Sequence, residues 1–91
     1  MLRVEITTQF KRDLKLAKRR NKNLLALKDI MKQIEAEKSL DKKYKDHTLI
    51  GYWHGHRECH IEPDWLLIYK LIPTEKMVIF TRTGSHADLF D

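Results

Sequence analysis

The 91-residue sequence contains little cysteine, glycine or proline, and it lacks any long apolar segment. With a single cysteine, Cys59, it can form neither an internal disulfide nor a structural metal site built from several thiolates. Three glycines and two prolines are too few for a low-complexity segment. The longest apolar run, WLLIY at residues 65–69, is far too short to cross a bilayer. These absences favour a folded protein, with no membrane contact, in a reducing compartment such as the cytoplasm.

The length predicts one domain over residues 1–91, and the charge is distributed unevenly along it. Residues 1–45 carry 14 Lys and Arg against 6 Asp and Glu, a net charge of +8, whereas residues 46–91 carry 4 against 7, a net charge of −3. Basic runs of this kind attract polyanions through phosphate contacts. Lys18, Arg19 and Arg20 are therefore candidate RNA contacts, although solvated helix faces have the same composition.

Hydrophobic periodicity predicts an α+β fold of order β-α-α-β-β-β. Residues 2–6 alternate as a half-buried strand does, and Thr7 or Thr8 can cap the helix that follows. Two apolar stripes with helical spacing flank the break NKN; they comprise Phe10, Leu14 and Ala17, then Leu24, Leu27, Met31 and Ile34. Further strands are predicted at residues 55–61, 65–72 and 76–83. We expect a helical hairpin covering one face of a mainly antiparallel sheet, with residues 65–72 as a central strand.

The predicted strand 55–61 places ionisable side chains on one face. Cys59 and Ile61 alternate with a polar row formed by His54, His56, Glu58 and His60. One interpretation is a metal site with His54, His56 and His60 as ligands. The other is metal-free acid–base chemistry by groups that titrate near neutrality, drawn from His47, His60, Asp64 and His86. Taken singly, each of these residues is more simply an ordinary surface residue or a turn cap.

The C-terminal segment FTRTGSHADLF, residues 80–90, follows the last predicted strand. Arg82 shares the parity of Val78 and Phe80, which places its guanidinium where the sheet ends. There it can bind phosphate through its bidentate fork or form a salt bridge with Asp64 or Asp88. Phe90 can stack on a base or close the core.

The segments KDHTLIGYW, RECHIEPDWLLIYK and FTRTGSHADLF together resemble the YafQ-type toxins of the RelE/ParE superfamily, over the whole chain. These toxins are ribosome-dependent mRNA endonucleases of bacterial toxin–antitoxin pairs. The resemblance implies a small microbial-RNase-like α+β fold and RNA cleavage without a metal or other cofactor. It also implies three partners: an antitoxin, the ribosome and mRNA.

Carried onto matching positions, the resemblance implies a catalytic set and a set of substrate contacts. The catalytic set is His47, His60, Asp64, Arg82 and His86, and the contacts are Phe90, Trp65 and Glu58. His54 and His56 fall outside the matching motif.

Attack by a ribose 2′-OH needs a base, an acid and positive charge near the phosphorane. We expect His86 as acid, Arg82 as clamp, His60 with Asp64 as base and orienting carboxylate, and His47 as support. The alternatives are a basic binding module that does not cut, a ParE-like inhibitor of DNA gyrase, and a metal-dependent hydrolase.

Overall fold

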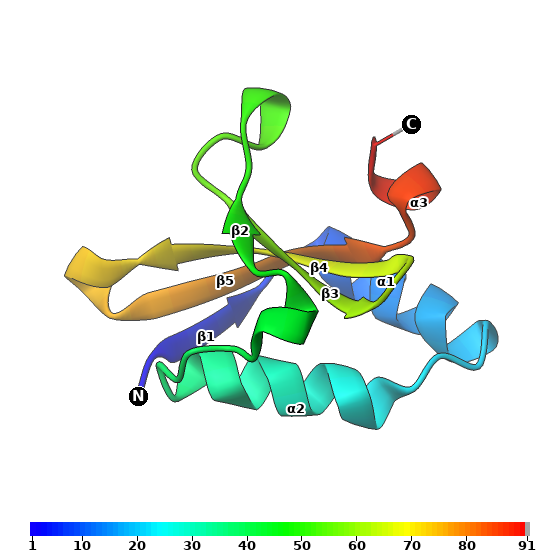
Figure 1. The fold of residues 1–91 in the computed structure, drawn as a ribbon, viewed down its shortest axis with the longest axis horizontal. Coiled ribbons are helices and arrows are strands. Elements are labelled where there is room, and N and C mark those ends of the chain that lie inside the picture. The colour runs from blue at the N-terminus through cyan, green and yellow to red at the C-terminus, as the bar shows by residue number, and fades with distance from the viewer. Residues whose placement is uncertain (91) are drawn as a thin grey trace.

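Figure 1 shows the computed structural model, which describes residues 1–90. The elements are β1 (Arg3–Ile6), α1 (Thr8–Arg19), α2 (Leu24–Glu35), β2 (His47–Thr48), β3 (Arg57–Glu62), β4 (Trp65–Ile72), β5 (Met77–Gly84) and α3 (His86–Phe90). The predicted order is confirmed, and the structure adds the short strand β2 and the short helix α3. No helix within these residues is both long and apolar enough to span a lipid bilayer.

The sheet has the strand order β1-β5-β4-β3-β2. Only β1 runs parallel to its neighbour, β5, whereas the other pairs are antiparallel. The predicted central position of β4 is confirmed. The strand predicted at residues 55–61 begins later, at Arg57. A 3-10 turn at Gly51–Trp53 precedes it, and Gly55 with φ +89° holds a conformation that a strand does not allow.

The helical hairpin is defined by local hydrogen bonds at its ends. The Thr7 hydroxyl accepts from the Phe10 amide at 2.9 Å and caps α1, as predicted. The Asn23 side chain accepts from the Ala26 amide at 3.1 Å and caps α2. Between the helices, Asn21 turns the chain at φ 58°. The break NKN therefore separates two capped helices.

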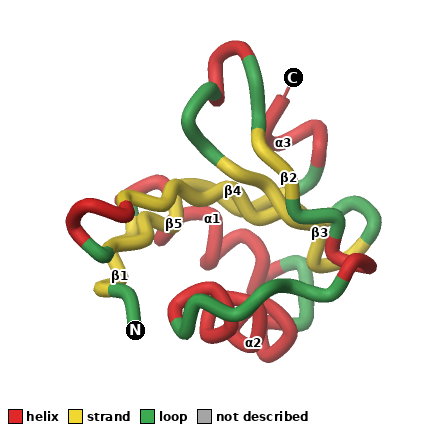
Figure 2. Tube along the Cα trace, turned by 60° about the vertical axis from the view of Figure 1, so that its left-hand side comes forward, coloured by secondary structure: helices red, strands yellow, loops and turns green. Residues whose placement is uncertain are grey.

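The two helices cover one face of the sheet, as Figures 1 and 2 show. Their buried side chains meet those of the three central strands in the main core: Phe10, Ala17, Leu27, Ile30 and Ile34 from the helices, with Cys59, Trp65, Leu67, Tyr69, Val78 and Phe80 from the strands. The opposite face has a smaller core, in which Leu66, Ile68 and Leu89 pack with Leu49 and Trp53. We call this second side the open face. Few side chains pack on this face, so part of the sheet surface stays accessible to a ligand.

A bulge in β5 changes which side chains share a face. Tyr69 lies opposite Phe80, but Ile68 lies opposite Arg82, so Thr81 is an extra residue on β5. The prediction that Arg82 shares the parity of Phe80 is therefore wrong. The register instead places Arg82 with Ile68 on the open face.

The outer edge of β5 beyond Phe80 is closed by a side chain. β1 ends at Ile6, which lies opposite Phe80, so β1 does not reach the last four residues of β5. There the Asp13 carboxylate of α1, only 6% exposed, accepts a hydrogen bond from the Thr83 amide at 3.1 Å. It also accepts from Arg82 Nε at 2.9 Å and Nη2 at 3.0 Å. This one carboxylate therefore accepts from an amide on the uncovered edge of β5 and binds a partly buried guanidinium at the same time.

We expect Asp13→Ala to lower the free energy of unfolding by about 3 kcal/mol, because it leaves a partly buried cation and a strand amide without their partner. The matched control is Asp29→Ala on α2. Among the described residues, the Asp29 carboxylate accepts a side-chain hydrogen bond only from Gln33, one turn along the same helix. This substitution should lower the free energy of unfolding by about 0.5 kcal/mol or less. Urea denaturation of both variants measures the difference. Equal losses would show that the strand edge does not depend on Asp13.

Candidate active site

A row of side chains crosses the open face from β2 to β5. The strand register aligns His47 with Glu58, Glu58 with Ile68, and Ile68 with Arg82. Neighbouring strands lie about 4.8 Å apart, so the row extends over roughly 14 Å. Two residues further along β3, His60 lies opposite Leu66 on the same face. The open face therefore carries the predicted histidine and carboxylate set.

Glu58 organises two of the histidines. Its carboxylate is buried, with 6% of the side chain exposed, and Oε1 lies 3.3 Å from His60 Nε2 and 3.6 Å from His47 Nε2. Because a carboxylate only accepts, Glu58 favours the tautomer of His60 that carries the proton on Nε2, which leaves Nδ1 as the basic nitrogen. His47 Nδ1 lies 2.6 Å from the Lys45 carbonyl oxygen, and because a carbonyl only accepts, Nδ1 is the nitrogen that donates there.

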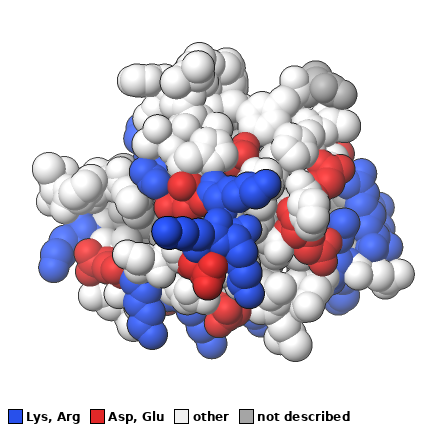
Figure 3. Space-filling view, viewed as in Figure 1, with Lys and Arg blue, Asp and Glu red and all other residues white. Residues whose placement is uncertain are grey.

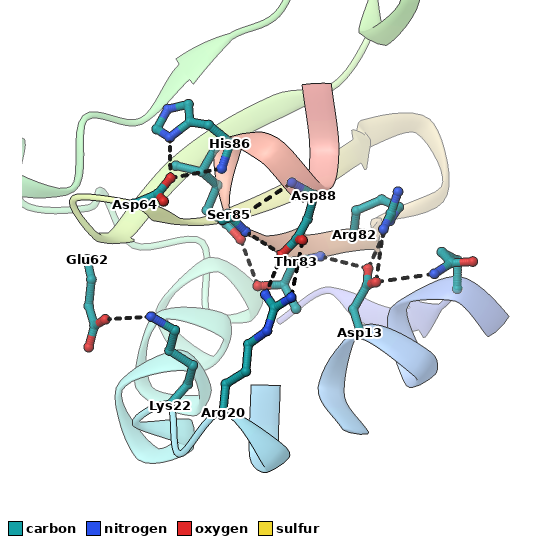
Figure 4. A network of polar contacts seen from close by, with 12 residues as sticks. Asp13, Arg20, Lys22, Glu62, Asp64, Arg82, Thr83, Ser85, His86 and Asp88 are labelled. Atoms are coloured by element: carbon teal, nitrogen blue, oxygen red, sulfur yellow. Dashed lines mark hydrogen bonds and ion pairs between the residues drawn. The ribbon is translucent and has the colours of Figure 1, made fainter. Parts of the chain in front are cut away.

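Asp64 binds His86 rather than His60. One oxygen, Asp64 Oδ1, accepts from the His86 ring Nδ1 at 2.6 Å and from the His86 backbone amide at 2.9 Å. The predicted pairing of Asp64 with His60 is therefore wrong. The turn at residues 63–64 brings the carboxylate to the start of α3, as Figure 4 shows. The hydrogen bonds from the His86 amide and ring lower the pKa of the Asp64 carboxyl.

Three imidazoles and one phenyl ring lie next to one another across this face. The ring centroids of His47 and His60 are 6.4 Å apart, and those of His60 and His86 are 5.7 Å apart. Phe90, 44% exposed, lies 6.3 Å from His86. Because Asp64 holds the His86 Nδ1 proton, Nε2 is the nitrogen that can exchange a proton with a ligand. The geometry therefore offers two imidazoles in different hydrogen-bonding roles, each oriented by its own carboxylate.

Two predicted substrate contacts are placed differently by the structure. Trp65 is 1% exposed in the main core, so its indole cannot stack on a ligand, and its buried Nε1 has no hydrogen-bond partner within residues 1–90. Strand alternation puts Trp65 on the face covered by the helices. Glu58 is 4% exposed, so it acts on a ligand only through the histidines that it binds.

The histidines outside the family-like motif do not lie on a strand. His54 is exposed after the 3-10 turn, and the His56 ring packs edge-on against Trp53 at 5.3 Å. The expected polar row of four alternating side chains is therefore wrong for these two residues. Within residues 1–90 no group of three or more His, Cys, Asp or Glu side chains has metal-binding geometry.

The basic end of α1 lies beside the site, and one of its residues is tied to α3. Lys18 and Arg19 are exposed. Arg20 instead forms an ion pair with Asp88, with Nη1 2.7 Å from Oδ2 (Figure 4). This pair makes Arg20 a support for α3, which carries His86 and Phe90. Its side chain is still 45% exposed, so the RNA contact of Arg20 stays a prediction.

Asp13 was not among the predicted residues, and Asp88 was considered only as a partner of Arg82, although the sequence carries a signal for the role of each. Ser85 and Asp88 form a capping box: the Ser85 amide donates to Asp88 Oδ2 at 2.9 Å, and the Asp88 amide donates to Ser85 Oγ at 3.1 Å. The pattern Ser-x-x-Asp is the sequence signature of that motif. Asp13 follows Phe10 by three residues and precedes Ala17 by four, so this acidic residue lies on the apolar stripe of α1.

Comparison with known proteins gives consistent matches over nearly the whole chain. The family described as "Bacterial toxin of type II toxin-antitoxin system, YafQ" matches residues 2–91. The mRNA interferase toxin YafQ of Escherichia coli strain K12 is 48% identical over 88 residues, covering 96% of this chain and 94% of that protein.

Solved structures agree with these sequence matches. The crystal structure of YafQ from E. coli strain BL21(DE3) has a TM-score of 0.93 at 42% identity, with 100% of both chains covered. The crystal structure of the E. coli DinJ-YafQ complex has a TM-score of 0.89 at 44% identity, again over 100% of both chains. The predicted fold class and the predicted resemblance are both confirmed.

The ion pair between Arg20 and Asp88 should restrain α3. We expect Arg20→Gln to raise amide hydrogen exchange at Leu89 by about fivefold, because a partly exposed pair contributes up to about 1 kcal/mol. Arg19→Gln is the matched control, since it removes a neighbouring exposed charge. If both variants left exchange at Leu89 unchanged, the capping box alone would hold the helix.

Asp88 should also make stability depend on pH. The Arg20 guanidinium and the Ser85 amide lower the pKa of Asp88 from 3.8 to about 2. A lowered pKa means that the stabilisation is complete above about pH 4 and disappears as the pH falls towards 2. A pair that contributes about 1 kcal/mol should make the Tm of wild type about 4 to 8 °C higher than that of Asp88→Asn at pH 6. This difference in Tm should vanish near pH 2. A difference that stayed constant over this range would contradict the assignment.

Proposed function

Because this chain belongs to the YafQ family of toxins from bacterial type II toxin–antitoxin systems, we propose that it is an endoribonuclease that cuts mRNA on the ribosome and stops translation. The observation that carries the proposal is the open face, where two imidazoles are each oriented by a separate carboxylate: His86 by Asp64, and His60 by Glu58. Acid–base cleavage of RNA needs two proton-transfer groups with different roles. The protein would act in the cytoplasm, where it would encounter ribosomes and mRNA.

In the proposed reaction the 2′-OH next to the scissile phosphate attacks phosphorus, and the 5′-oxygen leaves. His60 takes the 2′ proton on Nδ1, since its Nε2 proton is held by Glu58. Protonated His86 gives a proton from Nε2 to the leaving 5′-oxygen, while Asp64 holds Nδ1. The products are a 2′,3′-cyclic phosphate and a 5′-hydroxyl. No metal or organic cofactor takes part in these steps.

Positive charge for the phosphorane comes from Arg82 and His47 in this proposal. Arg82 uses Nε and Nη2 to bind Asp13, and its Nη1 makes no hydrogen bond to the described residues. Its side chain is 23% exposed. Asp13 thus orients the guanidinium, and the remaining N–H groups can meet a phosphate oxygen as charge develops there. The imidazolium of His47 would add a second cation on the far side of Glu58.

Affinity for the ribosome would come from the exposed cations outside the catalytic set. Lys18 and Arg19 at the end of α1 supply phosphate contacts without sequence preference. Phe90 supplies an exposed ring beside His86 on which a base can stack. The ribosome would contribute by positioning the message, since proximity and orientation lower the barrier of an otherwise slow reaction.

We also propose an antitoxin as partner. The solved complex of the E. coli relative contains DinJ, and a nuclease that stops translation requires control in its own cell. The formal net charge of +5 makes an acidic partner the best complement. Two alternatives remain for the test: a basic module that binds without cutting, and a ParE-like inhibitor of DNA gyrase. Neither requires the two imidazole–carboxylate pairs.

The direct test is to incubate the protein with translating ribosomes and to map the new mRNA ends. We expect cuts inside the A-site codon that carry 2′,3′-cyclic phosphate and 5′-hydroxyl ends. His86→Gln should slow single-turnover cutting by about 100-fold or more, because glutamine cannot transfer the proton. The same variant should keep its fold and its affinity for the antitoxin.

His54→Gln is the matched control, an identical substitution at an exposed histidine away from the three rings, and it should cut at the wild-type rate. Activity should also survive treatment of the toxin with a chelator before Mg²⁺ is restored for the ribosomes. Products with 3′-hydroxyl ends, together with loss of activity after chelation, would replace this proposal by metal-dependent hydrolysis. Translation arrest without new mRNA ends would favour a binding module.

A further inference from the structure

The loop between β2 and β3, residues 49–56, rises from the open face on the same side as α3. Figures 1 and 2 show both segments projecting away from the helical hairpin. The Leu49 amide donates to the His56 carbonyl oxygen at 2.9 Å and closes the base of the loop. Inside the loop, the His56 amide donates to the Trp53 carbonyl oxygen at 3.0 Å. The projection is thus a closed, hydrogen-bonded turn.

The tip of this loop exposes large apolar side chains and no formal charge. Residues 48–56 contain no Lys, Arg, Asp or Glu, and the upper part of the molecule is correspondingly white in Figure 3. Ile50 is 87% exposed and Tyr52 is 91% exposed. An exposed aromatic ring at the tip of an ordered projection suggests contact with a partner.

Tyr52 is held in place by the residues beneath it. Its ring stands edge-on against Trp53, with centroids 5.2 Å apart and an interplanar angle of 86°. Trp53 packs against the small core of the open face, which includes Leu89 of α3. Gly51 and Gly55 turn the loop at φ +69° and +89°, values that side-chain-bearing residues rarely adopt. The contact with Trp53 and the two glycine turns restrict the Tyr52 ring, so the ring loses less conformational entropy when a ligand stacks on it.

The loop is continuous with the candidate active site. It starts directly after β2, which carries His47, and its Trp53 shares a core with α3, which carries His86 and Phe90. In Figure 1 the sheet surface lies between the loop and α3. Each of the two segments that border this surface carries an exposed aromatic ring: Phe90 on α3 and Tyr52 in the loop.

We infer that Tyr52 stacks on a base of the bound mRNA, on the side of the scissile phosphate opposite to the base that meets Phe90. The inference rests on the function proposed above. Cleavage by a 2′-OH needs the two nucleotides that flank the phosphate to be splayed into an in-line geometry. Two exposed rings, one on the loop and one on α3, can hold one base each. An aromatic platform accepts any base, because every base has a π face, while cations elsewhere bind the phosphates.

The test uses an mRNA that binds but cannot be cut, with 2′-deoxyribose at the attacking position and 2-aminopurine at one position near it. Stacking on an aromatic ring quenches 2-aminopurine fluorescence. Wild type should quench the probe at a position adjacent to the cut, in programmed ribosomes. Tyr52→Phe should keep this quenching, and Tyr52→Ala should lose it and bind the programmed ribosome about tenfold more weakly, within the range for loss of one stacked base.

Ile50→Ala is the matched control, because Ile50 is an equally exposed apolar residue of the same loop without a ring; it should behave as wild type. If Tyr52→Ala weakened binding to ribosomes with and without mRNA equally, the ring would contact ribosomal RNA and the inference would be wrong. Weaker binding of the antitoxin alone would overturn it too. Cutting of an unmodified message by wild type tests the proposed function separately, so the two ideas can fail independently.

Discussion

The buried carboxylate of Asp13 is the contact on which the working end of this molecule depends. β1 is too short to cover all of β5, so the end of the sheet that carries Arg82 would expose an unpaired strand edge to the interior. Asp13 reaches that edge from α1 and accepts from both the Thr83 amide and the Arg82 guanidinium. One residue on the helical hairpin thereby determines where the hairpin packs on the sheet and how the guanidinium is oriented.

The same principle recurs in the other carboxylates of the region. Glu58 orients His60, Asp64 orients His86, and Asp88 connects the end of α1 to α3. Asp64 and Asp88 accept hydrogen bonds from groups 22 and 68 residues away in the sequence, whereas Glu58 lies beside His60 on the same strand. The polar side chains of the open face thus form a set of separate pairs. A histidine whose tautomer is defined by a carboxylate needs no reorganisation before it transfers a proton. The cost is a sensitivity to acid, because protonated carboxyls no longer bind these cations.

Charge and apolar surface are separated in space as well as in sequence. Figure 3 shows Lys and Arg mainly over the lower part of the molecule, whereas the projecting loop and α3 carry almost none. Non-directional phosphate attraction therefore comes from the helical side, and the open face presents rings and histidines. In the proposed function, this division would let the helical side attract a polyanion broadly while the groups of the candidate site contact it at specific points.

The sequence by itself determined the layers of the fold and most of the side chains that the structure brings together on the open face. Apolar periodicity placed the helical hairpin and the central strand β4, because burial on a face imposes a period of 3.6 or 2 whatever the partner is. Both helix caps lie within three residues of the amides that they bind, which is why a local pattern such as Thr7 before Phe10 predicts them.

The tertiary structure alone decided which carboxylate serves which partner. A salt bridge of Arg82 with Asp64 or Asp88 was one expectation, but Arg82 binds Asp13, 69 residues away, because β1 ends before Arg82 and α1 reaches the edge of β5 there. Asp64 was expected to orient His60 but binds His86, since the turn before β4 meets the start of α3 only in three dimensions. A periodic pattern assigns a side chain to a face, but a bulge shifts that assignment by one residue and a turn brings distant segments into contact. Pairing across the sheet therefore follows from packing and register, which no local run of residues encodes.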